Sequence, residues 1–586
     1  MMECAVVGKF FSPIFSSSRS VVVEKRKLPS LHKKIKFCSS KFKMKATQAE
    51  THLSQEAELQ AEKRGSSTGV GVGELIWPSP SDGTPFWKKD FPSSGVSPEV
   101  PADVKDSDPK HIIHVTAEMA PIAKVGGLGD VVTGLARACL SRGHTVDIML
   151  PFYECIQKQH IKDLTVITKY NSYHDGNWVP TNAYRGVVSG IPVIFIEPSN
   201  QFFKGQYVYG GSFNELEAYL FFSRACLEWM QQVTSTQPDI IHVHEWQTGA
   251  LPLLYWDIYH HLSLKKPRIV LTIHNMEHYG ECSKEQLSKS GLEGSVYASI
   301  DKAIDDRTIG HNPERLSLLK GGIVYSNAVV TVSPTYLKET LCTGWLASTL
   351  VRNRDKYFGI LNGIDTTMWN PATDIFLPVK FNDQKPEGKK FCKYYVQRGL
   401  GLASEGTQDG NHVPDITYKA PLVVCITRLV PQKGLHLISH AIKRIEELHN
   451  QGPCIRILLM FSEELSHLLY AAADMVLVPS IYEPCGLTQM IGMRYGAVPV
   501  VRKTGGLADT VFDMDDQSNH NRANGFVFEG IDEGSLICAL DRAFTYYREK
   551  PDEWNGILKK VMEVDNSWNN TAGKYVELYN SKSVRL

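Results

Sequence analysis

The chain has 586 residues, of which 63 are Lys or Arg and 63 are Asp or Glu, so its formal net charge is zero. This balance argues against a nucleic-acid partner and against a polybasic membrane patch. No apolar run is long enough to predict a transmembrane segment. One hydrophobic core cannot organise a chain of this length, so at least two domains are expected.

The twelve cysteines are scattered and never form a C-x-x-C pair. They predict neither a zinc site nor a disulfide framework, and they favour a reducing compartment. Residues 1–45 are rich in Ser, Lys and Arg and contain only two acids, Glu3 and Glu24. This bias is typical of an organellar transit peptide, and we predict a plastid address. A basic tail without a targeting role is the alternative.

Residues 46–108 are interpreted as a low-complexity linker region. It begins with a predicted short polar helix within 46–64 and continues as a stretch rich in Gly, Ser and Pro at 65–108. Trp77 and Trp87 lie within it, and docking on the body of the protein is favoured over sugar binding. From about residue 110 the pattern changes to buried strands that alternate with helices, with strands expected at 111–117, 146–150, 193–196, 240–244, 269–273 and 328–332. This alternation predicts a parallel sheet covered by helices.

A glycine-rich loop, Lys-Val-Gly-Gly-Leu-Gly-Asp at 124–130, joins the first strand to a helix. Glycines let backbone N–H groups approach an anion, and the start of the helix adds positive potential. Taken alone, the loop fits an ordinary glycine-rich turn with a surface lysine as well as it fits an anion site. Further polar residues follow other strands at 244–247 and 274–275, where ligands bind in such sheets.

A second alternating domain begins near residue 421, with strands expected at 422–427, 455–459, 475–479 and 498–501. Arg428 and Lys433 follow its first strand ahead of a helix, and they predict a second anion site, with ordinary solvated charges as the alternative. Two such domains with opposed cationic loops predict a cleft that binds a diphosphate. A single-domain epimerase or dehydrogenase does not fit this arrangement.

From about residue 110 to its end, the chain resembles plant starch synthases and bacterial glycogen synthases, which use ADP-glucose. The resemblance rests on the motifs at 124–130, 362–365 (Asn-Gly-Ile-Asp), 428–434 (Arg-Leu-Val-Pro-Gln-Lys-Gly), 483–489 (Glu-Pro-Cys-Gly-Leu-Thr-Gln) and 503–507 (Lys-Thr-Gly-Gly-Leu). Residues 358–362 and the insertion after Asn275 look most like the class IV and class V synthases. The resemblance implies an α/β protein of the GT-B fold, with two doubly wound Rossmann-like domains facing a cleft. Their expected bounds are 109–380 and 381–565, and residues 566–586 are expected to form a helix that crosses back to the first domain.

The resemblance also implies the roles of particular residues. The catalytic set is expected to be Lys124, His274, Arg428, Lys433 and Glu483. Lys124 and the Gly126–Gly127 backbone would hold the phosphates from one domain, with Arg428, Lys433 and the Gly505–Gly506 loop on the other. Glu483 would position the ribose and the glucose, His274 and Asn362 would contact the glucosyl unit, and Trp246 and Gln247 would meet the acceptor glucan. The remaining expected substrate-binding residues are Asp130, Glu245, Asn275, Cys485, Gly486 and Thr504.

The reaction that the resemblance implies is transfer of glucose from ADP-glucose to the non-reducing end of an α-1,4-glucan, with retention and without a metal or other cofactor. Retaining hydrolases commonly use a pair of carboxylates, and no such pair stands out in this sequence. A same-face displacement is therefore expected, in which the departing phosphate takes the proton of the acceptor and nearby cations stabilise the transition state.

Three departures from the family pattern stand out. Glu245 replaces the usual Asp of a His-Asp-Trp motif, and a shift of about 1 Å at an active site can cost on the order of 100-fold in rate. Phe461 replaces a usual Tyr. Only residues 450–454 separate a helix that ends near His449 from the strand at 455–459. A crossover needs about a dozen residues or more, so a β-α unit is missing, and we expect an exposed core face there.

Two functional hypotheses follow. The first is an active plastid starch synthase, favoured by the retained Lys124, Arg428, Lys433 and Glu483. The second is a weakly active or non-catalytic glucan-binding factor that acts with other plastid proteins in starch granule initiation. Glu245, Phe461 and the shortened second domain favour this alternative.

Overall fold

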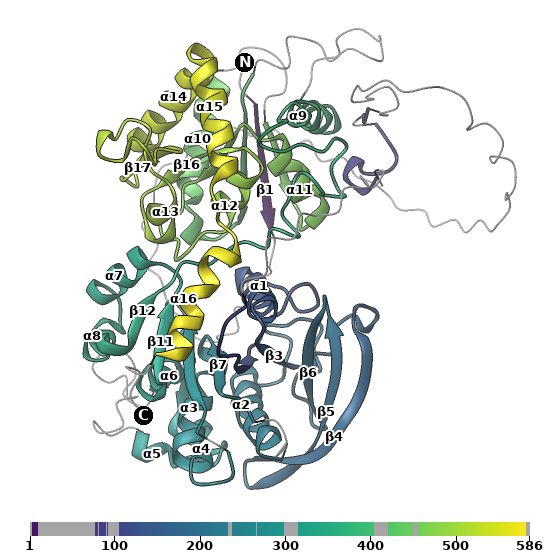
Figure 1. The fold of residues 1–586 in the computed structure, drawn as a ribbon, viewed down its shortest axis with the longest axis vertical. Helices are drawn as coiled ribbons and strands as arrows, with labels where there is room; N and C mark the ends of the chain where they lie inside the picture. Colours follow the sequence, from purple (N-terminus) through teal and green to yellow (C-terminus); the bar gives the residue numbers. More distant parts are fainter. Residues whose placement is uncertain are drawn as a thin grey trace, which may run out of the picture. The chain divides into compact units, whose positions relative to one another are not determined.

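The computed structural model describes residues 77–79, 81–89, 91, 105–232, 237–264, 266–297, 315–402, 420–448 and 455–581, together with the backbone of residues 3–9. The predicted polar helix within 46–64 lies outside these residues. None of the described helices is both long and apolar enough to cross a bilayer. Figure 1 shows the two sheets and their helices.

The first domain is built on a nine-stranded sheet in the order β12-β11-β8-β7-β2-β3-β6-β5-β4. The strands from β12 to β6 run parallel, and β5 and β4 add an antiparallel edge. All the strands predicted for this domain are present. The β4–β5 hairpin and β12 were not predicted. The strands are β2 (His111–Val115), β3 (Thr145–Pro151), β4 (Lys162–His174), β5 (Asn177–Val188), β6 (Ile191–Pro198), β7 (Ile240–His244), β8 (Arg268–Ile273), β11 (Ala328–Thr331) and β12 (Tyr357–Gly359).

Helices connect these strands, as the alternating pattern predicted. They are α1 (Gly127–Ser141), α2 (Glu215–Gln232), α3 (Ala250–Leu254), α4 (Lys284–Ser288), α5 (Gly294–Tyr297), α6 (Leu318–Tyr325), α7 (Pro334–Cys342) and α8 (Ala347–Arg352). Within the insertion after β8, a short antiparallel pair joins β9 (Glu281–Ser283) to β10 (Arg315–Ser317). Gly143 follows α1 with φ +94° and lets the chain turn sharply into β3.

The second domain has a six-stranded parallel sheet in the order β14-β1-β13-β15-β16-β17. Its strands are β13 (Leu422–Arg428), β14 (Ile455–Leu459), β15 (Met475–Val478), β16 (Val498–Arg502) and β17 (Phe526–Phe528), joined by β1 (Glu3–Lys9). Its helices are α9 (Gly388–Gly399), α10 (Leu435–Leu448), α11 (Glu463–Ala472), α12 (Thr488–Arg494), α13 (Gly505–Thr510), α14 (Glu533–Glu549) and α15 (Pro551–Glu563).

The N-terminal strand β1 fills a position between β13 and β14. It pairs in parallel with β13 from Glu3 to Lys9 and with β14 from Cys4 to Gly8. In Figure 1 this purple strand lies among the green elements of the second domain. The predicted leader at 1–45 therefore contains a strand of the second sheet. Only residues 449–454 separate α10 from β14, which is too few for a further strand and helix, and β1 is the strand that lies between β13 and β14.

One face of β14 carries exposed hydrophobic side chains. Ile457, Leu459 and the following Phe461 are each more than half exposed. They alternate along the chain, and alternate residues of a strand share one face. The expected exposure of a core face is thus confirmed.

The segment around residue 86 docks on the second domain. Trp77 packs edge-to-face on Tyr394, with ring centroids 4.8 Å apart. Phe86 is buried beside Tyr395, whose hydroxyl donates a hydrogen bond to the Phe86 carbonyl oxygen at 3.0 Å. The expectation that a tryptophan of this segment docks on the body is confirmed for Trp77.

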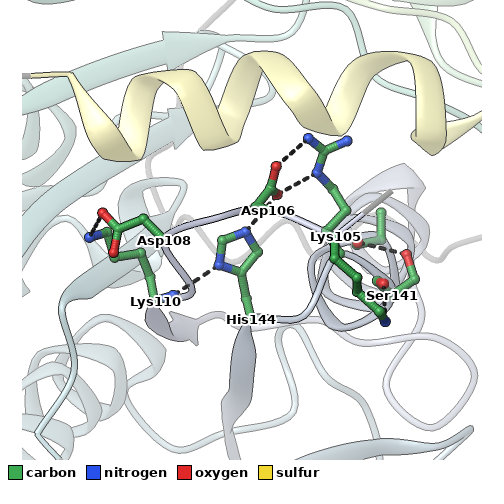
Figure 2. A network of polar contacts seen from close by, with 8 residues as sticks. Lys105, Asp106, Asp108, Lys110, Ser141 and His144 are labelled. Carbon is green, nitrogen blue, oxygen red and sulfur yellow. Dashed lines mark hydrogen bonds and ion pairs between the residues drawn. The ribbon is translucent and has the colours of Figure 1, made fainter. Parts of the chain in front are cut away.

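Polar contacts fix the chain where it enters the first domain (Figure 2). Asp106 accepts two hydrogen bonds from Arg142, both at 2.7 Å, and lies 3.0 Å from Nε2 of His144. The Lys110 backbone N–H is directed at Nδ1 of His144, so Nε2 carries the proton that reaches Asp106. Lys105 donates to the carbonyl of Ser141 at the end of α1. The ordered domain thus begins several residues before the predicted boundary at 109.

The last helix, α16 (Trp568–Asn580), packs on the first domain beside α1, as predicted. Trp568 lies so close to Gly134 of α1 that a Cβ at residue 134 would be 2.0 Å from the indole nitrogen. The Tyr579 hydroxyl lies 2.8 Å from Nδ1 of His242 on β7. These contacts tie the end of the chain to the first core.

Candidate active site

A pocket of about 870 Å³ is lined by residues of both domains. This volume lies within the range of small-molecule sites. Most of the predicted site residues line it: Lys124, Gly126, Gly127, Asp130, Glu245, Trp246, Gln247, His274, Asn275, Asn362, Arg428, Lys433, Glu483, Cys485 and Gly486. The three residues Thr504, Gly505 and Gly506 are not among its lining residues. The parallel strands explain this convergence, since their carboxyl ends meet at one edge of each sheet.

The glycine-rich loop is organised by Glu118, which follows β2. One oxygen of its carboxylate accepts the backbone N–H groups of Val125 and Gly126 at 2.9 and 2.8 Å. The Tyr209 hydroxyl donates to its other oxygen at 2.8 Å. Burial raises the pKa of Glu118 although these hydrogen bonds oppose the shift. The N–H of Gly126, predicted to hold a phosphate, is therefore already occupied by this carboxylate.

Lys124 reaches across the same loop to Asp130 in the first turn of α1, with Nζ and Oδ1 2.8 Å apart. Burial alone would lower the pKa of Lys124. The charge and hydrogen bond of Asp130 outweigh that effect, so the pKa lies above its usual value. Lys124 therefore carries a positive charge into the pocket at neutral pH.

The second domain places two cations opposite Lys124. Arg428 ends β13 and lines the pocket. Lys433 lies 2.5 Å from the nearer carboxylate oxygen of Glu483, and the Ser480 hydroxyl donates to the same oxygen at 2.7 Å. These contacts hold Lys433 and Glu483 together as one unit. The pocket thus has cationic side chains on both walls, as the opposed loops predicted.

The loop at 504–506 lies behind Glu483 instead of lining the pocket. The Gly506 N–H donates to the carbonyl oxygens of Glu483 and Pro484, both at 3.1 Å. Gly505 donates to Glu339 at 2.9 Å, and the Thr504 hydroxyl contacts the same carboxylate. These contacts support the Glu483 backbone, and the expected approach of this loop to the phosphates stays a prediction.

Substituting Gly505 by Ala is expected to displace Glu483. Gly505 has φ +44°, and a Cβ there would lie 2.1 Å from the Glu483 carbonyl oxygen. We expect the free energy of unfolding to fall by about 2–3 kcal/mol. The matched control is Gly556→Ala in α15, where a Cβ meets nothing within 4 Å. Thermal unfolding of both variants checks this, and equal melting temperatures would contradict it.

Glu245 follows β7 in a backbone conformation with φ +63°, which is unusual for a residue other than glycine. Its Oε1 accepts the backbone N–H groups of His274 and Asn275 at 2.5 and 2.7 Å. The longer side chain therefore reaches the turn after β8, where it joins two of the predicted site segments. Burial raises the pKa of this carboxyl from its ordinary 4.5 to about 8, despite the hydrogen bonds.

This shift predicts a stability change with pH. An unfolded chain releases the Glu245 proton near pH 4.5, whereas the folded chain holds it up to about pH 8. The free energy of unfolding contributed by this group therefore falls as the pH rises through this window. Glu245→Gln mimics the neutral acid, so its melting temperature should rise relative to the parent between pH 5 and pH 8 by calorimetry. Parallel melting curves for the two proteins would contradict the assignment.

Residues predicted to contact the glucosyl unit or the acceptor glucan also lie together in the pocket. Trp246 packs edge-to-face on Tyr219 with ring centroids 5.7 Å apart. The side-chain oxygens of Gln247 and Asn362 are buried and have no hydrogen-bond partner among the described residues. Two buried acceptors in one pocket are a feature that a polyhydroxylated ligand would satisfy, because a buried oxygen without a partner costs free energy.

Sequence reasoning missed several lining residues. Tyr209 comes from the connection between β6 and α2, Glu215 is the first residue of α2, and Glu463, Ser466 and Tyr470 come from α11. These residues neither belong to a motif nor directly follow a strand. Glu118 directly follows the strand expected at 111–117, and this position at a strand end is the signal that could have found it. Phe461 lines the pocket, so this departure from the family pattern lies at the site.

Comparison with known proteins identifies the first domain. The family described as "Starch synthase catalytic domain" matches residues 111–345. The probable starch synthase 4 of Arabidopsis thaliana, named chloroplastic/amyloplastic, is 43% identical over 80% of this chain and 46% of its own length. This chain thus spans less than half of that plant relative.

Other relatives are matched over their whole length. A glycogen synthase of Protochlamydia amoebophila is 40% identical, over 81% of this chain and 100% of its own. The solved catalytic domain of starch synthase IV from Arabidopsis thaliana, bound to ADP and acarbose, is 42% identical. It covers 81% of this chain and all of that chain, with a TM-score of 0.76. These matches support the GT-B fold, and the chain belongs to the starch and glycogen synthase family of glycosyltransferases.

Proposed function

We propose that this chain transfers glucose from ADP-glucose to the non-reducing end of an α-1,4-glucan, with retention of configuration. The observation that carries the proposal is the pocket in which Lys124 of one domain and Arg428 and Lys433 of the other line the same space. Cations on both walls suit a diphosphate, since charge-assisted hydrogen bonds to phosphate are strong. The ADP and acarbose bound to the related starch synthase IV domain support a nucleotide and a sugar as ligands here.

Three carboxylates of the pocket, Glu118, Glu245 and Glu483, favour a same-face displacement over a double displacement. Glu118 and Glu245 accept backbone N–H groups, and Glu483 binds Lys433 and Ser480. Each has a structural partner that a nucleophile would have to leave. In the proposed step the acceptor hydroxyl oxygen bonds to the anomeric carbon while the bond from that carbon to the phosphate oxygen breaks. The hydroxyl proton passes to the departing phosphate, and ADP leaves.

Lys433 and Arg428 would stabilise this step by electrostatics. Negative charge builds on the diphosphate as the glycosidic bond breaks, and fixed cations stabilise that charge more in the transition state than in the ground state. Lys433 is held in place by Glu483 at 2.5 Å, so little reorganisation is needed. We assign Glu483 a second role in positioning the sugar nucleotide, as the family resemblance implies.

We also propose a plastid location and no cofactor. Support for the location comes from the plant relatives, which are named chloroplastic/amyloplastic. A second candidate function is a non-catalytic glucan-binding factor in granule initiation, with plastid proteins of that process as partners. The exposed Ile457, Leu459 and Phe461 of the shortened second domain favour it.

The test is transfer of labelled glucose from ADP-glucose to glycogen by the full chain. Lys124→Ala and Glu483→Ala should each abolish incorporation, and Lys503→Ala should not, because Lys503 pairs with the exposed Glu529 outside the pocket. Incorporation that survives Lys124→Ala and Glu483→Ala would overturn the assigned site. A folded chain that binds glycogen without incorporation would establish the second candidate.

A further inference from the structure

Three histidines form a hydrogen-bonded row that leads from the first core to the pocket. His114 lies on β2, His244 ends β7, and His274 follows β8 and lines the pocket. Nδ1 of His114 is 3.1 Å from Nε2 of His244, and Nδ1 of His244 is 3.2 Å from Nε2 of His274. The rings are within about 35° of parallel along the row.

Each histidine of the row is neutral at physiological pH. Burial lowers the pKa of His114 and of His274 to about 3, and that of His244 well below its usual value. A neutral imidazole has one N–H and one bare nitrogen. Each link in the row needs one donor and one acceptor, so the tautomer of one ring fixes the tautomers of the other two.

The buried end of the row sets its direction. Nε2 of His114 is buried and has no hydrogen-bond partner among the described residues. Buried N–H groups without a partner are rarer in proteins than acceptors without one. Nε2 of His114 is therefore the bare nitrogen, and its Nδ1–H donates to His244. His244 then donates through Nδ1–H to Nε2 of His274.

We propose that His114 and His244 are positioning residues that hold His274 as the Nδ1–H tautomer, so that it presents a fixed donor to the pocket. This inference rests on the proposed function, in which His274 contacts the glucosyl unit. A fixed N–H would donate to an oxygen of the sugar nucleotide. In the opposite tautomer the same ring could only accept a hydrogen bond from a sugar hydroxyl.

A metal site does not explain this cluster. Nitrogens of His114, His242 and His244 lie within 4.8 Å of one another. However, His242 uses both ring nitrogens, at 2.8 Å from the Tyr579 hydroxyl and 2.7 Å from the Thr272 hydroxyl. Both nitrogens of His244 are used in the row. His242 stacks on His244 but stands outside the row, which makes it a matched control.

The test reads the tautomer directly. The full chain is labelled with ¹⁵N-histidine, long-range ¹H–¹⁵N correlations are recorded, and His274 is assigned by comparison with His274→Gln. We expect a protonated Nδ1 and a bare Nε2 on His274, because the two nitrogen types resonate far apart. A bare Nδ1 in the parent protein would overturn the proposal. This measurement needs no turnover, so its outcome is separate from that of the proposed function.

Variants then show which residue sets the tautomer. His244→Phe should return His274 to the Nε2–H form that free imidazole side chains prefer. It should lower kcat on the order of 10-fold with KM for ADP-glucose nearly unchanged. His242→Phe should leave the His274 tautomer as in the parent. His114→Asn keeps a donor toward His244 and should preserve the tautomer, which keeps the test decisive where His244→Phe does not fold. An unchanged tautomer in folded His244→Phe, or a reversed one in His114→Asn, would refute the positioning role.

Discussion

Lys433→Ala is expected to lower kcat for glucan synthesis by about 100- to 1,000-fold, the usual cost of removing one fixed group that stabilises transition-state charge. Lys433 is held at 2.5 Å from Glu483, so its loss also leaves a buried carboxylate without its cation. That charge would repel the diphosphate of the donor. Steady-state rates at saturating ADP-glucose measure the effect.

Two variants make the result specific. Lys433→Arg keeps the charge but changes its geometry, and it should retain more activity than the alanine variant. Lys503→Ala removes a lysine that is paired with Glu529 on the surface, and it should behave as the parent protein does. A Lys433→Ala protein that is folded and turns over within about 3-fold of the parent would remove Lys433 from the proposed mechanism.

Val6→Pro is expected to lower the melting temperature of the second domain by about 5 °C. We expect the substitution to lower the free energy of unfolding by about 2 kcal/mol. In a domain of this size each kcal/mol lowers the melting temperature by about 2–4 °C. Val6 pairs with Cys425 on one side and Ile457 on the other. Proline has no N–H to donate, and within a central strand it removes a ladder hydrogen bond. Calorimetry of the full chain measures the shift.

The control is the same substitution elsewhere in the predicted leader, Val22→Pro, which lies outside β1 and should leave the melting temperature unchanged. Deletion of residues 1–10 should have a larger effect than Val6→Pro, because it removes the whole strand between β13 and β14. Melting temperatures that stay equal in all three proteins would show that β1 does not stabilise the second domain.

This prediction bears on the plastid proposal. A leader cut near residue 45 would remove β1 together with the targeting sequence. The mature protein therefore either keeps residues 3–9 and with them β1, or begins near residue 46 and lacks β1. N-terminal sequencing of the protein recovered from plastids decides between them.

Much of the fold could be predicted from the sequence. Strands such as β13 and β16 are short apolar runs followed by glycine or charge, and that pattern is local. The β4–β5 hairpin was missed because three of its exposed residues, Val166, Ile167 and Trp178, are apolar. They interrupt the alternation of apolar and polar residues that identifies a half-buried strand in a sequence. The place of β1 could not be predicted, because its partners are more than 400 residues away and nothing local to residues 3–9 specifies them.

The motifs predicted which residues form the site more completely than they predicted the contacts between those residues. Lys433 and Glu483 were both expected, but their direct pairing depends on how β13 and the turn after β15 meet. The family resemblance assigned the loop at 504–506 to the phosphates. The structure adds a packing reason for its two glycines, since backbone of residues 483–485 lies where their side chains would be. A glycine indicates that another group comes close to the backbone, but the sequence does not show whether that group is a ligand or the protein's own backbone.

The most direct test of the two-domain site is the affinity of the full chain for ADP, measured by calorimetry in the parent, in Lys124→Ala and in Lys433→Ala. Lys124 lies in the first domain and Lys433 in the second, and both line one pocket. If both domains hold one diphosphate, each substitution should weaken binding by about 10-fold or more. If either variant bound ADP as tightly as the parent does, the domain that carries the substituted lysine would not bind the nucleotide. That result would contradict the proposed site.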